Sequence, residues 1–174
     1  QFLATGLLVT SPMFAASYEC TYATYTRLEF NRVYDGMLAA PMTVTDLFIG
    51  EMLWCATKGF FFSLAILIIL FIFGILPIGY TLLSPLIGFL VGFVFSGLSL
   101  LITSFIHNMN YFNFYFTGIL TPMFFFSGVM FSVTSLPIML QYAAETLPLL
   151  HCTRLIRAVC SSGYTIITAW DIAY

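Results

Sequence analysis

The 174-residue chain carries only five Lys or Arg and seven Asp or Glu side chains, with a formal net charge of −2. A soluble globular protein of this length would carry roughly 44 charged residues. With 61% hydrophobic residues and a mean hydropathy of +1.03, this chain cannot build the polar surface of a water-soluble domain. The composition also excludes the clustered Lys and Arg of a nucleic-acid-binding protein. The main solvent of this chain is therefore lipid.

The hydrophobic pattern predicts an all-α, polytopic helical membrane protein with a single transmembrane domain over residues 1–174. Residues 59–144 contain no Asp, Glu, Lys or Arg, and at ~20 residues per span this interval holds three spans. A less apolar segment precedes them, and we expect it to lie mainly against other helices. The four predicted spans cover residues 2–22, 60–76, 82–106 and 111–131.

Most of the charged residues lie between Arg27 and Lys58, which marks an aqueous loop between the first two spans. Residues 31–40 read as a short amphipathic helix that Pro41 ends. Thr43 and Asp46 then offer capping oxygens for a new helix that continues into the second span.

In the third span, Gly88, Gly92 and Ser96 recur every four residues, a spacing that permits close contact with another helix. Beyond the fourth span, residues 132–163 contain two apolar pieces, 136–144 and 147–159, each too short to cross the ~30 Å hydrocarbon core. We therefore predict a re-entrant or interfacial helical hairpin that carries four polar side chains: Glu145, His151, Arg154 and Arg157.

The cationic residues Arg27, Arg32 and Lys58 flank the charged loop and place it in the cytoplasm. Counting crossings puts residues 107–110 inside and the hairpin outside. Arg154 and Arg157 on the outer side go against the positive-inside rule, a conflict that eases if the hairpin returns to the surface from which it enters.

Catalytic and metal-binding chemistry is not expected. His107 and His151 have no carboxylate or cysteine at ligand spacing, and Lys58, which is the only lysine, is not part of a phosphate-binding loop. All four cysteines read as small apolar residues, with a Cys152–Cys160 bridge as an alternative if that segment bends.

Two groups of polar residues each leave two interpretations open. Tyr18, Tyr22 and Tyr25 share one helical face beside Glu19, either as a wet aromatic strip on which sugar rings stack or as interfacial anchors. Glu51 and Lys58 lie two turns apart on one face, either as interfacial side chains or as a buried pair that couples loop movement to the helix.

Four stretches resemble the membrane subunits of type-2 ABC exporters, which include exporters of O-antigen, teichoic acid and nodulation factors, and the nodulation-factor branch looks closest. The stretches are FLATGLLVTSPMFAASYECTYATYTRLEFNRVYDGMLAAPMTVTDLFIGEMLW, YFNFYFT, TPMFFFSGVMFSVTSLP and LPLLHCTRLIRAV. The resemblance implies six spans in the full protein, with the first and last absent here, two permease copies, and a separate cytoplasmic ATPase that binds ATP and Mg²⁺. It also implies that the cytoplasmic coupling loop, residues 27–46, docks that ATPase through Leu28, Glu29, Arg32, Asp35, Met37, Leu38 and Pro41.

We therefore expect a multi-pass permease subunit of the plasma (inner) membrane that exports an amphipathic glycan-lipid or lipo-oligosaccharide. The chain itself is not expected to be an enzyme or to hold a cofactor or metal, and its substrate-path candidates are Tyr18, Glu19, Tyr22 and Tyr25. The alternatives are a drug or hydrophobic-compound efflux permease of the same fold, an integral membrane enzyme, and a structural membrane protein.

Overall fold

In the computed structural model, which describes residues 2–75, 80–106, 108–129 and 138–160, every regular element is helical. The first helix, α1 (Phe2–Tyr18), continues through two π-helical turns, Glu19–Ala23 and Thr26–Phe30, and the short helix α2 (Val33–Leu38) follows. The two longest helices are α3 (Val44–Ile72) and α4 (Ser84–Phe105), and a 3₁₀ turn at Tyr80–Leu83 leads into α4.

The rest of the described chain forms shorter helices. A 3₁₀ turn (Met109–Tyr111), α5 (Phe112–Tyr115), a π-helical turn (Phe116–Leu120) and α6 (Thr121–Phe126) make one nearly continuous rod. Helices α7 (Ile138–Glu145) and α8 (Pro148–Cys160) then form the predicted pair of short helices.

Local sequence explains most of the helix boundaries. Thr43 caps α3 as expected: its Oγ1 accepts from the Asp46 amide at 3.3 Å, and Asp46 accepts from the Thr43 amide at 3.0 Å. Helix α3 ends at Ile72, before the predicted limit of 76, because Gly74 adopts a left-handed φ of 64°. The fourth helical rod likewise ends at Phe126, short of 131, and Gly128 has a φ of 76°.

By length and apolar composition, two helices of the described chain could cross a membrane, Val44–Ile72 and Thr81–Phe105. The spans predicted at 2–22 and 111–131 and the re-entrant course of the hairpin stay predictions. His107, the end of the span predicted at 60–76 and both ends of the hairpin lie outside the described residues.

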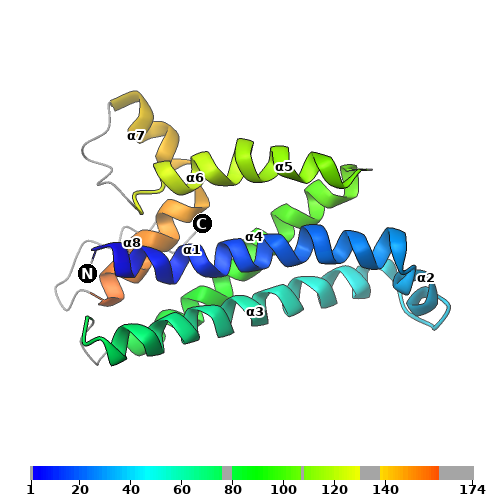
Figure 1. The fold of residues 1–174 in the computed structure, drawn as a ribbon, viewed down its shortest axis with the longest axis horizontal. Coiled ribbons are helices and arrows are strands. Elements are labelled where there is room, and N and C mark those ends of the chain that lie inside the picture. The colour runs from blue at the N-terminus through cyan, green and yellow to red at the C-terminus, as the bar shows by residue number, and fades with distance from the viewer. Residues whose placement is uncertain (1, 76–79, 107, 130–137, 161–174) are drawn as a thin grey trace.

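Helix α1 lies at the centre of the packing, against α3, α4 and α8. Its buried face contributes Leu8, Val9 and Met13 to a core that also includes Phe95 of α4 and Ile156 of α8. Figure 1 shows that α2 and the turn between α4 and α5 lie at one end of the molecule, whereas α7 and the N-terminus lie at the other.

The contact between α3 and α4 depends on small residues. A Cβ added at Gly88 would overlap Ser63, and one added at Gly92 would lie 3.1 Å from the Ala56 Cα atom. Ser96, one turn further on, is fully buried at the same contact. The close helix contact predicted from the four-residue spacing is therefore present, with α3 as the partner of α4.

Candidate functional site

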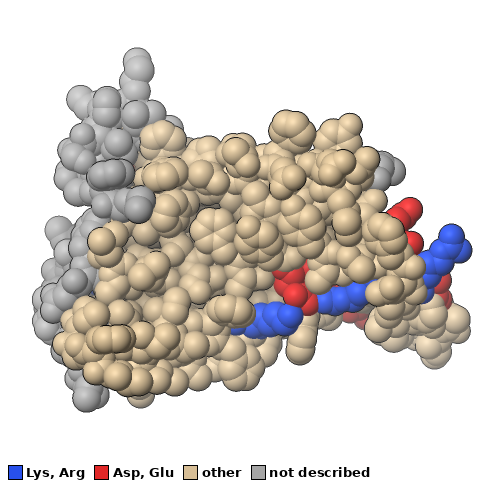
Figure 2. Space-filling model, viewed as in Figure 1, with Lys and Arg blue, Asp and Glu red and all other residues tan. Residues whose placement is uncertain are grey.

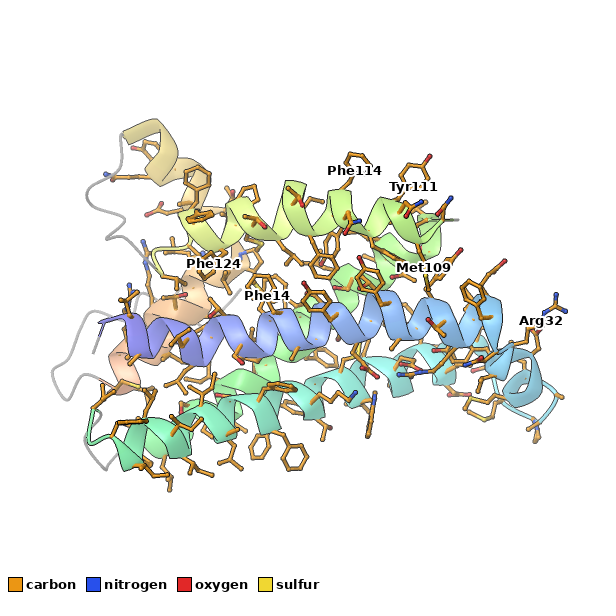
Figure 3. All side chains as sticks on the ribbon, in the orientation of Figure 1. Phe14, Arg32, Met109, Tyr111, Phe114 and Phe124 are labelled. Carbon is orange, nitrogen blue, oxygen red and sulfur yellow. A yellow bond between two sulfur atoms is a disulfide. The ribbon has the colours of Figure 1, made fainter. Side chains whose placement is uncertain are left out.

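The predicted ATPase-coupling residues form an exposed surface at one end of the molecule. Arg32 begins α2 with a left-handed φ of 46°, which turns the chain sharply after the second π-helical turn. Figure 3 shows Arg32 at this end, and all seven predicted residues are exposed: Leu28, Glu29, Arg32, Asp35, Met37, Leu38 and Pro41. Because three of them are large apolar residues, the surface offers a partner both apolar and charged contacts.

Charged side chains gather at the same end. On the face that Figure 2 shows, the coloured charged side chains lie toward α2, and the rest of the described surface is tan. Tyr34 is the exception to the exposure of α2, since it is only 5% exposed and turns inward. Burial and the hydrogen bond to the Glu51 carboxylate raise the pKa of Tyr34, so its hydroxyl keeps its proton and acts as a donor.

A groove of about 760 Å³ runs along α1 and is walled by α3 and by Phe124 of α6. Phe14 and Phe124 both line it and contact each other, with ring centroids 6.1 Å apart (Figure 3). Most of its lining is apolar or small, while four polar side chains mark the end nearer α2: Tyr18, Glu19, Tyr22 and Lys58. The groove therefore has the amphipathic character that a cargo with an apolar and a polar part requires.

Of the four predicted substrate-path residues, Tyr18, Glu19 and Tyr22 line the groove. Tyr18 stacks on Phe116 with centroids 4.3 Å apart, and the Tyr22 hydroxyl donates to the Asn113 Oδ1 atom at 3.3 Å. The Tyr18 side chain is still half exposed (52%), so its ring remains available for contact.

Tyr25, the fourth predicted substrate-path residue, lies outside the groove. Tyr25 is only 6% exposed, packs on Phe112 and does not line the groove. Phe112 also contacts Tyr22, with ring centroids 5.2 Å apart, so Tyr22 and Tyr25 lie on a common side of the helix.

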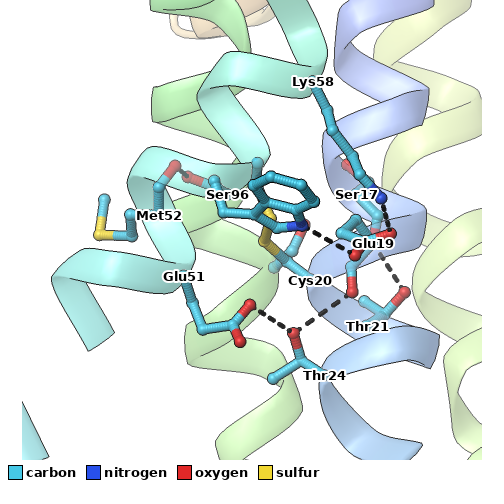
Figure 4. Close-up of a disulfide and its surroundings, with 12 residues drawn as sticks. Ser17, Glu19, Cys20, Thr21, Thr24, Glu51, Met52, Lys58 and Ser96 are labelled. Atoms are coloured by element: carbon cyan, nitrogen blue, oxygen red, sulfur yellow. Dashed lines mark hydrogen bonds and ion pairs between the residues drawn. A yellow bond between two sulfur atoms is a disulfide. The ribbon is translucent and has the colours of Figure 1, made fainter. Parts of the chain in front are cut away.

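A network of charged side chains joins the polar end of the groove to the base of α2. Arg27 pairs with Glu19 through one guanidinium nitrogen and with Glu51 through the other, the latter at 2.6 Å. Lys58 pairs with Glu19 at 2.7 Å, as Figure 4 shows. The Trp54 indole donates to Glu19 at 3.2 Å.

Glu51 is the second hub of this network. It accepts from Tyr34 at 2.6 Å and from Thr24 at 3.5 Å, in addition to the pair with Arg27. The Glu19 and Glu51 side chains are only 15% and 11% exposed, so these partners offset the cost of removing two carboxylates from water. Two acidic and two basic groups leave the network with no net charge.

The structure revises both interpretations of Glu51 and Lys58. The two side chains do not pair with each other. Each forms its ion pair with a residue of the first helical segment, Arg27 for Glu51 and Glu19 for Lys58. Their common face on α3 was predicted correctly, but that face packs against the first segment, where the opposite charges lie.

Cys20 and Cys55 form a disulfide between the first helical segment and α3. The prediction that all four cysteines are unpaired is therefore wrong for these two, whereas Cys152 and Cys160 are free. Cys20 and Cys55 can pair because the first helical segment and α3 cross closely at small buried residues such as Ala16 and Ala56. Cysteines 35 residues apart carry no local sign of this contact.

The four hairpin residues form a separate cluster at the opposite end. Arg154 pairs with Glu145 at 3.5 Å, and the His151 Nε2 atom lies 2.9 Å from the Glu145 carbonyl oxygen. Arg157 donates to the Gly128 carbonyl oxygen at 2.6 Å. These contacts join α7 to α8 and α8 to the end of α6. Across the described chain, no three His, Cys, Asp or Glu side chains gather closely enough to hold a metal ion.

Two helices long and apolar enough to cross a membrane, together with the low charge of the chain, indicate a helical membrane protein. The chain belongs to the ABC-2 type transporter family, whose model matches residues 1–160. This family assignment confirms the resemblance seen in the sequence.

Within that family the chain is similar to Nodulation protein J of several bacteria. It is 35% identical to the protein of Sinorhizobium fredii over 90% of this chain and 60% of the relative. It is 38% identical to that of Rhizobium leguminosarum bv. trifolii over 91% of this chain and 60% of the relative. The chain thus spans about three fifths of the length of these relatives. No solved structure matches it.

Proposed function

We propose that this chain is the permease subunit of an ATP-driven ABC exporter that moves an amphipathic glycan-lipid or lipo-oligosaccharide out of the cell. The observation that carries the proposal is the groove along α1. Its apolar length suits an acyl chain, while the tyrosines and charged groups at its α2 end suit a sugar headgroup, which stacks on aromatic rings and hydrogen bonds to charged side chains. Family membership supports the transport role, and the similarity to Nodulation protein J supports this branch of exporters.

The energy source is a separate cytoplasmic ATPase subunit with ATP and Mg²⁺, since the chain lacks a phosphate-binding loop. The exposed surface around α2, from Leu28 to Pro41, is where this partner docks. Two copies of the permease form the export pathway in the plasma (inner) membrane, and each copy crosses it several times. For ATP to drive transport, the ATPase must bind two conformations of the permease with different affinity.

Replacing both Tyr18 and Tyr22 with leucine tests the sugar-binding end of the groove. Leucine keeps a large apolar side chain at each position but removes the hydroxyl and the aromatic ring on which a sugar would stack. We expect export of the lipid-linked glycan to fall about tenfold, which corresponds to a loss of ~1.4 kcal/mol in cargo contact, while membrane abundance is unchanged.

The matched control is Tyr111→Leu, since Tyr111 is 57% exposed and does not line the groove. Equal losses of export and abundance in the Tyr18/Tyr22 variant would show that these tyrosines only anchor the helix. Undiminished export of the glycan-lipid would reject the sugar-binding role.

The largely apolar lining, which includes Phe14, Phe62 and Phe124, favours a second candidate, a hydrophobic-compound efflux permease of the same fold. Efflux of an uncharged hydrophobic dye by the Tyr18→Leu, Tyr22→Leu variant distinguishes the two. Two results together would support this second candidate: the variant still exports the dye, and the unaltered protein does not export the glycan-lipid.

A further inference from the structure

Helix α2 has one inward-facing contact with the charged network. Tyr34 is the one buried residue of α2, and its hydroxyl donates to the Glu51 Oε1 atom at 2.6 Å. Glu51 belongs to α3, so this hydrogen bond joins the exposed docking surface to a long apolar helix.

From Glu51 the contacts continue without a break to the groove. Arg27 bridges Glu51 and Glu19, and Glu19 holds Lys58 at 2.7 Å. Glu19 and Lys58 both line the groove, while Arg27, Glu51 and Tyr34 do not. The chain of contacts therefore runs from a surface where a partner could push to the polar end of the groove.

We propose that Tyr34, Glu51 and Arg27 are positioning residues that transmit movement of α2 to Glu19 and Lys58 in the groove. This inference rests on the proposed function, because it takes the ATPase as the partner that moves α2. These three residues do not line the groove, so they would act on the cargo only through Glu19 and Lys58.

The network can rearrange because Arg27 has a carboxylate on each side. With Tyr34 in place, Glu51 shares its Oε1 atom between the tyrosine hydroxyl and Arg27. Withdrawal of Tyr34 leaves Arg27 as the main partner of Glu51 and draws the guanidinium away from Glu19. Glu19 and Lys58 are then free to reorient toward a polar headgroup in the groove.

Trp54 offers a direct probe, because its indole donates to Glu19 at 3.2 Å and Lys58 lies 5.2 Å from its ring centroid. The chain has two tryptophans, Trp54 and Trp170, so a Trp170→Phe background leaves Trp54 as the reporter. The permease is labelled with 5-fluorotryptophan, reconstituted in nanodiscs and mixed with the unlabelled ATPase. The ¹⁹F chemical shift of Trp54 is recorded before and after addition of a non-hydrolysable ATP analogue.

Two variants interrupt the proposed path, Tyr34→Phe, which removes one hydroxyl and keeps the ring, and Glu51→Gln, which keeps the side-chain shape. Tyr111→Phe removes a hydroxyl from an exposed tyrosine away from the network and is the control. We expect the nucleotide-dependent shift of Trp54 to be present in the unaltered protein and the control, and to be lost in both network variants. Cargo moved per ATP hydrolysed should fall in the same two variants.

A Trp54 shift of unchanged size in Tyr34→Phe and Glu51→Gln would overturn the inference and leave the proposed function standing. The inference would also be overturned if the Trp54 signal of the protein with an intact network did not respond to nucleotide while the ATPase is bound. Failure of any ATPase to co-purify with the permease would instead reject the proposed function, and the inference with it.

Discussion

At the scale of single residues, Arg27 bridges the two carboxylates of the charged network. Among the described residues it is the one cation that contacts both partly buried carboxylates, Glu19 and Glu51. Without it, two negative charges would lie close together in a partly buried region, with only Lys58 to balance them. The sequence does not indicate this bridge directly, because Glu19 lies 8 positions and Glu51 24 positions from Arg27.

Replacing Arg27 with methionine should therefore reduce stability more than the same change at Lys58. Arg27→Met should cost about 2 kcal/mol, between the values for exposed and fully buried ion pairs, and Lys58→Met under ~1 kcal/mol, because Lys58 has one carboxylate partner and is more exposed. Thermal unfolding in detergent measures the difference, with Arg32→Met as an exposed control. Equal effects of the Arg27 and Lys58 changes would contradict the bridging role of Arg27.

The capping box of α3 gives a residue-scale prediction about pH. Hydrogen bonds from the side chain and backbone of Thr43 lower the pKa of Asp46. A lowered pKa means that ionised Asp46 contributes to the stability of the first turn above its ordinary pKa near 3.8, and that this contribution is lost as pH falls through the lowered value. Hydrogen exchange of the amides at 44–47, corrected for intrinsic rates, should show less protection in acid. Thr43→Ala should remove this pH dependence, and an unchanged dependence would argue against the cap.

At the scale of helices, the α3–α4 contact is the best test of how sequence spacing sets packing. A Cβ at Gly92 would meet backbone atoms of Cys55 and Ala56, which cannot move aside as the end of a side chain can. Gly50 of α3, by contrast, has nothing within 4 Å of an added Cβ. The two glycines are thus both helical, Gly92 in α4 and Gly50 in α3, but differ in their surroundings.

Gly92→Ala should destabilise the protein by about 1–3 kcal/mol through overpacking, whereas Gly50→Ala should stabilise it by roughly 0.5–1 kcal/mol through backbone entropy. Thermal unfolding of the two variants under identical conditions makes the comparison. If Gly92→Ala is as stable as the unaltered protein, the helices do not approach as closely as the structure shows.

Residues with strictly local signals were predicted correctly, such as the Thr43 cap and the four-residue spacing of Gly88 and Gly92. Features that depend on two distant segments were missed. The Cys20–Cys55 disulfide and the partners of Glu51 could not be found, because both need the packing of the first segment on α3. The burial of Tyr25 was missed for the same reason, since it depends on packing against the distant Phe112.

At the scale of the whole molecule, the charged residues are divided between the two ends. One end contains the exposed surface around α2 and the turn between α4 and α5 (Figure 1). The network of Glu19, Arg27, Glu51 and Lys58 lies toward this end. The hairpin cluster of Glu145, Arg154 and Arg157 lies at the other end, beside the end of α6. This arrangement is the one expected if the helices cross the membrane in alternating directions, and it gives each end a separate role.

The arrangement makes topology directly testable with reporter fusions placed after Asn110 and after Cys160. Because the α4–α5 turn lies at the α2 end and α8 follows the return of the rod formed by α5 and α6, the two fusions should report opposite compartments, with Asn110 in the cytoplasm. A third fusion after Pro41, within the coupling surface, should agree with the one after Asn110 and serves as the internal control. If the fusions after Asn110 and Cys160 reported the same compartment, the rod formed by α5 and α6 would not cross the membrane. The pairing of Arg157 with the Gly128 carbonyl would then hold α8 on the cytoplasmic side, where Arg154 and Arg157 would obey the positive-inside rule.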